Sequence, residues 1–314
     1  MLSLIADIGG THSRCAITRG DGSLKHSRVF ENRDFTGLAE LLKGYVDTLP
    51  AEQRPGAGLL AIAAPILGED VRMINIDWQY SVPGLARELG FDDLQILNDF
   101  EALAIALPVL EDAQLSQLGG GKPQADKPKV VMGPGTGLGV ASLIPVDDVW
   151  RAISGEGGHV TLAASNEDEA RVIARVRSEY GHCSAERLIS GPGLSYLHRL
   201  LHETDDELAP ERIAELADAG NGAALQTLEM FFALFGTVAA NVALTLGAFG
   251  GLYVGGGVIR RNAEHFARSG FRERFEAKGR YGNYLKSIPT YLITAEEPAL
   301  IGLAALARNA ARNT

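Results

Sequence analysis

Apolar residues recur along this chain in two patterns: short uninterrupted runs, and longer segments with an apolar residue at every third or fourth position. The runs are typical of buried strands, and the longer segments are typical of helices with one face against a core. The predicted strands are 2–6, 13–18, 24–30, 58–66, 94–97, 129–132, 140–144, 250–259 and 291–293. The predicted helices are 35–49 (capped by Asp34 or Thr36), 82–89, 98–107, 168–180, 194–202, 210–219, 223–246 and 300–309.

The order of these elements predicts the fold class. Strands and helices alternate, which indicates an α/β architecture with a mainly parallel sheet in each lobe. At 314 residues the chain is long enough for two lobes. The segment 118–128 is rich in Gly, Pro and Lys, so we expect a loop there and a boundary between lobes close by.

One construction occurs twice: a buried strand, a glycine-rich turn that contains Thr, and a second strand. The first turn, 8–11 (Ile-Gly-Gly-Thr), follows Asp7, and the second turn is 133–139. Such turns present backbone N–H groups to phosphate oxygens, and glycine lets the ligand come close. Asp7 lies where a hydrated Mg²⁺ bound to that phosphate could sit. A plain hairpin with Gly-Gly at its turn is the alternative for 8–11.

Polar residues follow another predicted strand. Asn98 and Asp99 stand where the strand 94–97 ends and a helix begins. Both residue types are preferred helix N-caps, which is one interpretation. Strand carboxyl ends in α/β sheets also face the ligand crevice, and an Asp there can take a proton from a substrate hydroxyl.

Three further polar residues carry candidate chemistry. Glu156 and His159 lie among three glycines, in a segment that we expect to be a flexible turn not built for packing. Glu186 precedes a Ser-Gly-Pro-Gly loop and on its own is better explained as a surface charge. Together with Asn98 and Asp99 these residues form a set of carboxylates, an amide and an imidazole that suits the hydroxyl groups of a sugar. The set has no His pair and no Cys cluster, so it is unlike a metal site.

Composition narrows the class of protein. Charged residues make up 22% and the formal net charge is −10, with no basic run, so we expect no nucleic-acid partner. Cys15 and Cys183 are far apart in the sequence and form no disulfide framework, which favours a reducing compartment. We expect no signal peptide before the first strand and no apolar run of transmembrane length. We therefore expect a cytoplasmic protein without membrane contact.

Several motifs follow one another in a specific order over almost the whole chain. They are 6–11 (Ala-Asp-Ile-Gly-Gly-Thr), 97–100 (Leu-Asn-Asp-Phe), 133–139, 155–159, 186–193, 255–257, Phe275 with 278–280, and 288–293. In this order they strongly resemble bacterial glucokinases of the hexokinase/actin-like ATPase superfamily. The resemblance implies a two-lobed actin-like ATPase (ribonuclease H-like) fold, with a small α/β domain, 1–109 joined by the C-terminal helix 300–314, a large α/β domain, 110–299, and a cleft between them.

The resemblance also implies an activity and the residues that perform it. The activity is ATP-dependent phosphorylation of glucose at O6, with Asp99 as general base, ATP and Mg²⁺ as cofactors, and a homodimer as the common assembly. The implied glucose contacts are Asn98, Asp99, Glu156, His159 and Glu186. The implied ATP contacts are Ala6, Asp7, Ile8, Gly9, Gly10, Thr11, Gly135, Thr136, Gly137, Gly256 and Gly257, with Asp7 reaching the metal through water.

Two alternatives stand beside glucose phosphorylation. One is a kinase for another hexose, such as fructose, mannose or an N-acetylhexosamine, because a single hydroxyl group can change specificity by orders of magnitude. The other is a non-catalytic sugar-sensing regulator, which the acidic charge disfavours, as does a first strand at Leu2 that leaves no room for a preceding helix-turn-helix. His12 stands where this group often has Asn after Thr, so its role stays open.

Overall fold

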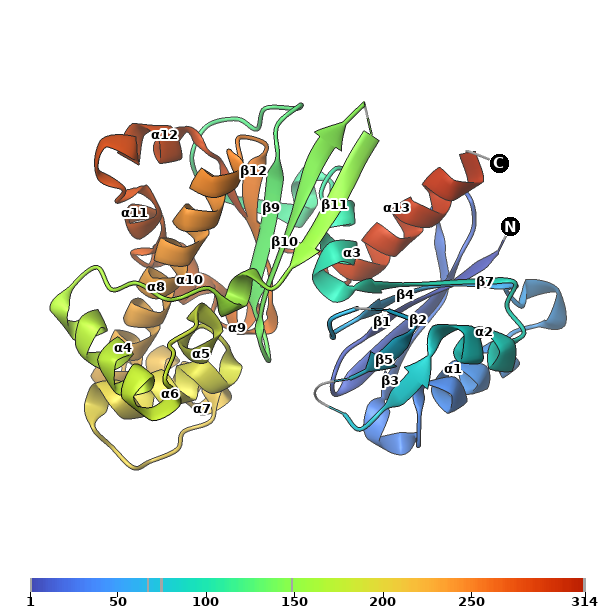
Figure 1. Ribbon diagram of the computed structural model, residues 1–314, viewed down its shortest axis with the longest axis horizontal. Coiled ribbons are helices and arrows are strands. Elements are labelled where there is room, and N and C mark those ends of the chain that lie inside the picture. Colours follow the sequence, from blue (N-terminus) through green and yellow to red (C-terminus); the bar gives the residue numbers. More distant parts are fainter. Residues whose placement is uncertain (1, 67, 74–75, 148, 313–314) are drawn as a thin grey trace. The chain divides into compact units, whose positions relative to one another are not determined.

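The chain forms two compact units in the computed structural model (Figure 1). One unit combines Met1–Glu111 with Ala295–Thr314, and the other is Asp112–Thr294. The structure describes residues 2–66, 68–73, 76–147 and 149–312.

The first unit is built on a five-stranded sheet with the order β3-β2-β1-β4-β7. These strands are β1 (Ser3–Ile8), β2 (His12–Thr18), β3 (Leu24–Glu31), β4 (Ala57–Ile62) and β7 (Asp93–Asn98). The first three form an antiparallel meander, and β4 and β7 run parallel to β1. A small hairpin, β5 (Asp70–Arg72) with β6 (Gln79–Ser81), completes the strands of this unit.

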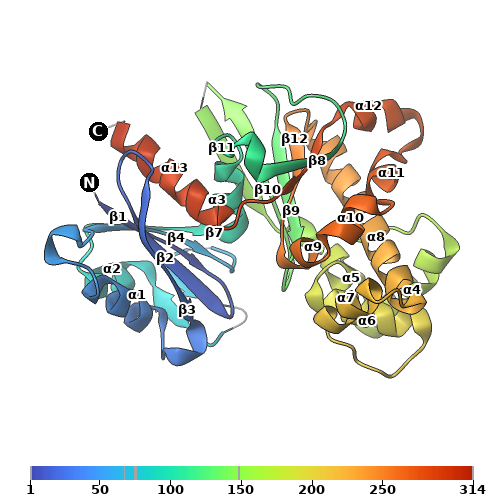
Figure 2. The ribbon, with the colours of Figure 1, turned by 180° about the vertical axis from the view of Figure 1, so that it is seen from behind.

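Helices cover both faces of this sheet. One face packs against α1 (Leu38–Asp47) and α2 (Val82–Leu89), and the other against α3 (Asp99–Ala106) and α13 (Pro298–Arg312). Figure 2 shows α13 lying beside α3 although their sequences are far apart. The two helices approach closely at Gly302, where a Cβ atom would lie 1.9 Å from the carbonyl oxygen of Ala102. Glycine at this position therefore sets the spacing between the helices.

The second unit is built on a six-stranded sheet with the order β11-β10-β9-β12-β13-β8. Its strands are β8 (Leu115–Gly119), β9 (Lys129–Pro134), β10 (Leu138–Val146), β11 (Val149–Gly155), β12 (Gly251–Val254) and β13 (Thr290–Ile293). β9, β10 and β11 form an antiparallel meander, and β12 and β13 run parallel to β9. The first five strands of the order thus repeat the topology of the first unit, and β8 adds an antiparallel edge.

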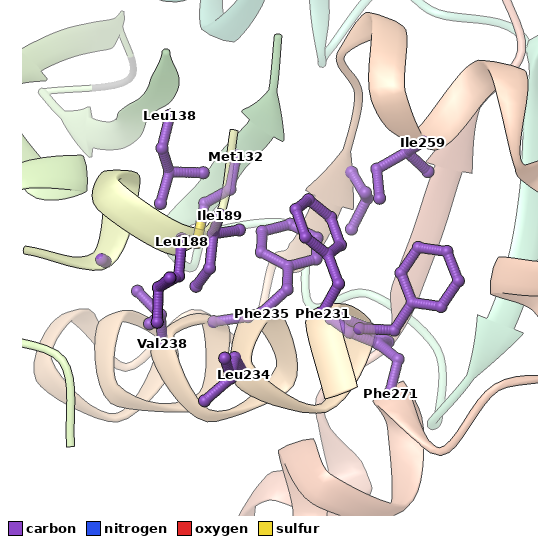
Figure 3. Close-up of a cluster of buried hydrophobic side chains, with 14 of the residues drawn as sticks. Met132, Leu138, Leu188, Ile189, Phe231, Leu234, Phe235, Val238, Ile259 and Phe271 are labelled. Atoms are coloured by element: carbon purple, nitrogen blue, oxygen red, sulfur yellow. The ribbon is translucent and has the colours of Figure 1, made fainter. Parts of the chain in front are cut away.

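The helices of the second unit gather on a large hydrophobic core. They are α4 (Glu167–Tyr180), α5 (Ala185–Leu188), α6 (Gly191–His202), α7 (Pro210–Asp218), α8 (Gly222–Leu246), α9 (Gly257–Arg261), α10 (Ala263–Arg268), α11 (Phe271–Glu276) and α12 (Gly282–Ser287). Figure 3 shows side chains of α8, among them Phe231 and Phe235, meeting Met132 and Leu138 from the sheet and Leu188 from α5. One core therefore anchors both the sheet and the segment that carries α5.

Short helical turns occupy several of the connections. They are η1 (Asn32–Asp34), η2 (Ala51–Gln53), η3 (Asp112–Gln114), η4 (Gly157–His159) and η5 (Gly279–Tyr281).

The α/β class is confirmed, but the prediction of mainly parallel sheets is wrong. Each sheet is mixed, because it contains a three-stranded antiparallel meander that precedes two parallel strands in the chain. Two predicted strands are too long: β4 ends at Ile62 rather than 66, and β12 ends at Val254, after which α9 begins. Part of the expected loop 118–128 belongs to β8.

The predicted cap of the first helix is also wrong. α1 begins at Leu38, its N-cap is Gly37, and no side chain caps it. The backbone N–H and the hydroxyl of Thr36 instead donate to the Glu40 carboxylate, 2.8 and 2.7 Å away. Glu40, in the first turn of the helix, therefore holds the residues that lead into α1, in place of an N-cap side chain.

The expectation that no apolar run reaches transmembrane length needs correction. By length and composition alone, α8 could cross a membrane. However, 67% of its most apolar window is buried inside the second unit, and the core helix of a soluble protein passes the same test.

Candidate functional site

Two predicted ligand-binding segments lie at one edge of the first sheet. In the register of the parallel strands, Ile8 is opposite Ile62, and Ile62 is opposite Asn98. The carboxyl ends of β1, β4 and β7 therefore coincide, and neighbouring strands are about 4.8 Å apart. The turn 8–11 and the pair Asn98–Asp99 are thus brought to the same edge, roughly 10 Å from each other.

The turn 8–11 is held by a side chain that the sequence analysis missed. Asn32 is 1% exposed, and its amide donates to the carbonyl oxygen of Gly9 at 2.8 Å. Ser13, which is fully buried, donates to the amide oxygen of Asn32 at 2.7 Å. The backbone N–H of Asn32 donates to the carbonyl oxygen of Thr11 at 2.9 Å. Asn32 and Ser13 therefore fix the turn from its inner side. His12 is exposed at the start of β2, and its role stays open.

Asp7 lies on β1 next to this turn and opposite Arg14 on β2. Burial raises the pKa of Asp7, the charge of Arg14 acts to lower it, and Glu297 acts to raise it. Among the residues that the structure describes, no cluster of three or more His, Cys, Asp or Glu side chains could hold a metal ion by itself. As a carboxylate beside the turn, Asp7 fits a Mg²⁺ ion that is bound mainly by phosphate oxygens and water, because such an ion needs only one or two protein carboxylates.

Asn98 and Asp99 form the junction between β7 and α3. The side-chain oxygen of Asn98 accepts from the backbone N–H groups of Phe100 and Glu101 at 2.9 and 3.4 Å, so the N-cap interpretation is confirmed for Asn98. The amide of Asn98 also donates to the carbonyl oxygen of Ala64 at 3.3 Å. Asp99 begins the helix, and its carboxylate lies where helix N-termini stabilise negative charge.

The second sheet repeats this arrangement with two glycine segments. Val254 is opposite Met132, so 255–257 lies beside the turn that follows β9. A Cβ atom on Gly133 would lie 2.6 Å from the backbone of Gly255, which leaves room only for glycine. Gly256 has a φ of 90° and a Cβ there would lie 2.4 Å from the carbonyl oxygen of Pro134. The two segments therefore pack backbone against backbone.

The predicted sugar contacts of the second unit lie together. The Nε2 atom of His159 is 3.5 Å from a carboxylate oxygen of Glu186 and 4.0 Å from one of Glu156. The segment with His159 runs beside α5, because the N–H of Ala185 donates to the carbonyl oxygen of Val160 and an isolated bridge joins Thr161 to Ser184. The three side chains form a cluster of hydrogen-bonding groups that sugar hydroxyls could meet.

Two of the three glycines in this segment make close packing contacts, so the expectation of a turn not built for packing is wrong. Gly158 is buried, and a Cβ on it would lie 2.2 Å from the carbonyl oxygen of Leu138. A Cβ on Gly157 would lie 3.0 Å from the side chain of Val140. The segment forms the turn η4, which rests directly on β10. Glycine permits this close contact.

A pocket of about 390 Å³ opens on the second unit beside these residues. Thr136 from the glycine turn and His159 and Glu186 from the cluster all line it, together with side chains of α6. Candidate contacts for phosphate and for sugar in this unit thus share one concave surface. Concave surfaces with convergent polar groups are the usual form of small-molecule sites.

The sequence model of the glucokinase family matches residues 4–310. The chain is 46% identical over 308 residues to the "Bifunctional protein glk" of Burkholderia pseudomallei, covering 96% of this chain and 48% of that protein. It is 42% identical over 309 residues to the glucokinase of Cronobacter sakazakii, covering 96% of both. The chain thus spans about half the length of the Burkholderia relative and nearly all of the Cronobacter one.

Solved structures show the same fold. A glucokinase from an Antarctic psychrotroph is similar with a TM-score of 0.87 and 34% identity, over 98% of this chain and 99% of that one. A ROK family glucokinase from Streptomyces griseus is similar with a TM-score of 0.66 and 18% identity, over 98% of this chain and 100% of that one. These likenesses confirm the predicted two-lobed actin-like fold.

Proposed function

Because the chain belongs to the glucokinase family, we propose that it transfers the terminal phosphoryl group of ATP to O6 of glucose. One observation carries the proposal: a glycine turn, Asp7 and the pair Asn98–Asp99 converge at the carboxyl edge of one sheet. Phosphoryl transfer needs a phosphate cradle, a metal-supporting carboxylate and a base for the attacking hydroxyl. The first unit supplies a candidate for each.

The proposed base is Asp99. Its carboxylate takes the proton from the attacking hydroxyl group as the oxygen–phosphorus bond forms. Asn98 fixes the start of α3 through its cap, so the carboxylate is carried on a rigid helix end. Catalysis then consists mostly of positioning and electrostatic stabilisation.

The remaining proposed contacts divide between the sugar and the nucleotide. Asn98, Asp99, Glu156, His159 and Glu186 bind glucose. Ala6, Asp7, Ile8, Gly9, Gly10, Thr11, Gly135, Thr136, Gly137, Gly256 and Gly257 bind ATP. In support, Cβ atoms added at Gly135 and Gly257 would meet no protein atom within 4 Å, so both backbones are open to a ligand. Asp7 would hold Mg²⁺ through water, and when bound this ion would neutralise charge on the phosphate oxygens.

The ligands bound in related structures support glucose and ATP as the substrates. The similar structure from Balamuthia mandrillaris is a glucokinase in complex with glucose, and the one from Streptomyces griseus is in complex with glucose and AMPPNP. We further propose that the unit Met1–Glu111 with Ala295–Thr314 is the small domain, expected at 1–109 with 300–314, and that the unit Asp112–Thr294 is the large domain, expected at 110–299. A homodimer in the cytoplasm that binds neither nucleic acid nor membranes completes the proposal.

A hexose panel tests this function. The release of ADP is followed in a coupled assay with glucose, fructose, mannose and N-acetylglucosamine at equal concentrations. We expect the highest kcat/KM with glucose. A higher value with another hexose would reassign the substrate, and sugar binding by calorimetry without ADP release would favour the regulator.

A further inference from the structure

Glu186 contacts the phosphate turn as well as the sugar-binding cluster. One carboxylate oxygen, Oε2, accepts a hydrogen bond of 2.8 Å from the backbone N–H of Leu138. Leu138 is the first residue of β10 and lies near the end of the turn 133–139. The same oxygen would lie 2.5 Å from a Cβ on Gly137, so the carboxylate rests directly on the turn. A side chain at 137 would require this carboxylate to move.

The other carboxylate oxygen of Glu186 faces the cluster. Oε1 lies 3.5 Å from Nε2 of His159, and the side chain is 31% exposed. The carboxylate therefore divides its two oxygens between the inside of the unit and the pocket. A hydroxyl group that donates to Oε1 would polarise and reorient the same carboxylate whose other oxygen accepts from Leu138.

A second contact ties the turn to the segment that follows Glu186. The N–H of Gly191 donates to the carbonyl oxygen of Gly135 at 2.7 Å. Between these two contacts, Leu188 and Ile189 are fully buried in the core that also contains Leu138, as Figure 3 shows. The segment 186–191 thus contacts the turn at two points, Gly135 and Leu138. Because Leu188 and Ile189 are packed in the core, a rotation of Glu186 would act on the turn rather than on the rest of the segment.

We propose that Glu186 is a positioning residue through which sugar binding organises the phosphate turn, so that glucose raises the affinity for ATP. This rests on the proposed function only in taking glucose and ATP as the ligands. The coupling is reciprocal, since two ligands that bind one protein must affect each other equally. Couplings of this kind are usually about 5- to 150-fold in affinity.

Calorimetry with Mg²⁺ and AMPPNP, with and without saturating glucose, tests the coupling. In the wild-type protein we expect AMPPNP to bind at least about fivefold more tightly when glucose is present. Glu186→Gln should bring this ratio close to one. Glu156→Gln is the matched control, because Glu156 lies 4.0 Å from the same Nε2 atom of His159, whereas it is Glu186 that accepts from Leu138. It should weaken glucose binding yet keep the wild-type ratio at saturating glucose.

Amide hydrogen exchange of a peptide covering 133–142 provides a readout that needs no ligand. Glu186→Gln replaces a charge-assisted hydrogen bond by a neutral one, so we expect exchange in the free protein to be about three- to tenfold faster. Glu156→Gln should leave it unchanged. Wild-type exchange in Glu186→Gln, or a ratio near one in the wild type, would overturn the inference. If the wild type fails to phosphorylate glucose but the exchange result holds, the proposed function fails and the positioning role of Glu186 stands.

Discussion

The two glycine turns share a strand–turn–strand construction, but different kinds of side chain hold them. Asn32 holds the turn 8–11 and is 1% exposed, with Ser13 and two backbone carbonyl oxygens as partners. Glu186 holds the turn 133–139 and is 31% exposed at the edge of a pocket. The first support is neutral and sealed off from solvent, and the second is charged and open to it.

The difference teaches that equal backbone motifs can respond differently to a ligand. A buried neutral amide whose partners are all protein atoms has no exchangeable contact, so the first turn keeps one geometry. A carboxylate with one oxygen toward a pocket can exchange water for a sugar hydroxyl group, so the second turn is adjustable. Substitutions at the two turns should therefore have different effects: the first turn should keep its geometry, and the second should respond to the ligand.

The largest expected effect comes from Asp99→Asn in the unit with the fixed turn. The amide keeps the size of the carboxylate but cannot take the proton from the sugar hydroxyl. We expect kcat to fall about 10²- to 10⁴-fold while the affinity for AMPPNP changes little. Steady-state kinetics and calorimetry on the same preparation check both values. A near-normal kcat would mean that Asp99 serves only the start of α3.

Asn32→Ala should cause the next largest effect. It leaves Ser13 and the carbonyl oxygen of Gly9 without their partner in a buried place, which costs about 2–3 kcal/mol of unfolding free energy. Urea unfolding followed by circular dichroism measures the loss. Ser13→Ala removes only one of these bonds and is the graded control, with an expected loss of about 1 kcal/mol. Equal losses in the two variants would contradict the role given to Asn32.

Gly137→Ala and Gly135→Ala form the sharpest pair for the second turn. Neither glycine has a left-handed backbone, but a Cβ at 137 would meet Glu186 at 2.5 Å and a Cβ at 135 would meet nothing within 4 Å. Gly137→Ala must displace the Glu186 carboxylate, so we expect glucose and AMPPNP each to bind about tenfold more weakly. That factor corresponds to the loss of one good hydrogen bond for each ligand. Gly135→Ala should weaken AMPPNP alone. Calorimetric titrations that show the same pattern for both variants would rule out the contact at 137.

The smallest effect concerns Lys129, which begins the strand leading to the second turn. Its ammonium group donates to the carbonyl oxygen of Gly250 at 3.2 Å, and no carboxylate within the described parts of the chain lies within 4 Å of it. Burial lowers the pKa of Lys129. The folded protein therefore releases this proton at a lower pH than the unfolded chain, and stability rises with pH between the two pKa values.

Lys129→Met should accordingly stabilise the protein by about 1 kcal/mol at neutral pH, because a buried charge without a counterion is removed. The Tyr253 hydroxyl still donates to the carbonyl oxygen of Gly250. Urea unfolding at several pH values measures the gain, which should shrink as the pH approaches the ordinary lysine range near 10.5. A gain that does not depend on pH would show that packing, not charge, is responsible.

The sequence predicted the elements whose signal is local. Both strand–turn–strand constructions, α2 and the long core helix α8 follow from apolar runs, capping residues and glycines within a few positions. β11 was missed because its side chains alternate between exposed and half-buried and give no apolar run. The hairpin of β5 and β6 was missed because each strand has only three residues.

The supports of the two turns could not be predicted from local patterns. Asn32 reaches Gly9 across 23 positions, and Glu186 reaches Leu138 across 48. A single Asn or Glu carries no periodicity, so only the fold brings it to its partner. The chemical type of the sugar-binding set was recognisable from the sequence, but the fact that one of its members also holds a backbone turn was not.

The contact between Gly302 and Ala102 has a consequence for how the protein is made. Residues 298–312 complete the helical layer on which α3 rests, and α3 begins at Asp99. A ribosome must synthesise the whole second unit before α13 emerges, which takes roughly 10 to 40 s at about 5 to 20 residues per second. During that time α3 is the only one of the two helices that covers this face of the first sheet, and the apolar residues that α13 buries stay exposed. The helix that carries the proposed base is therefore among the last parts of the nascent chain to mature.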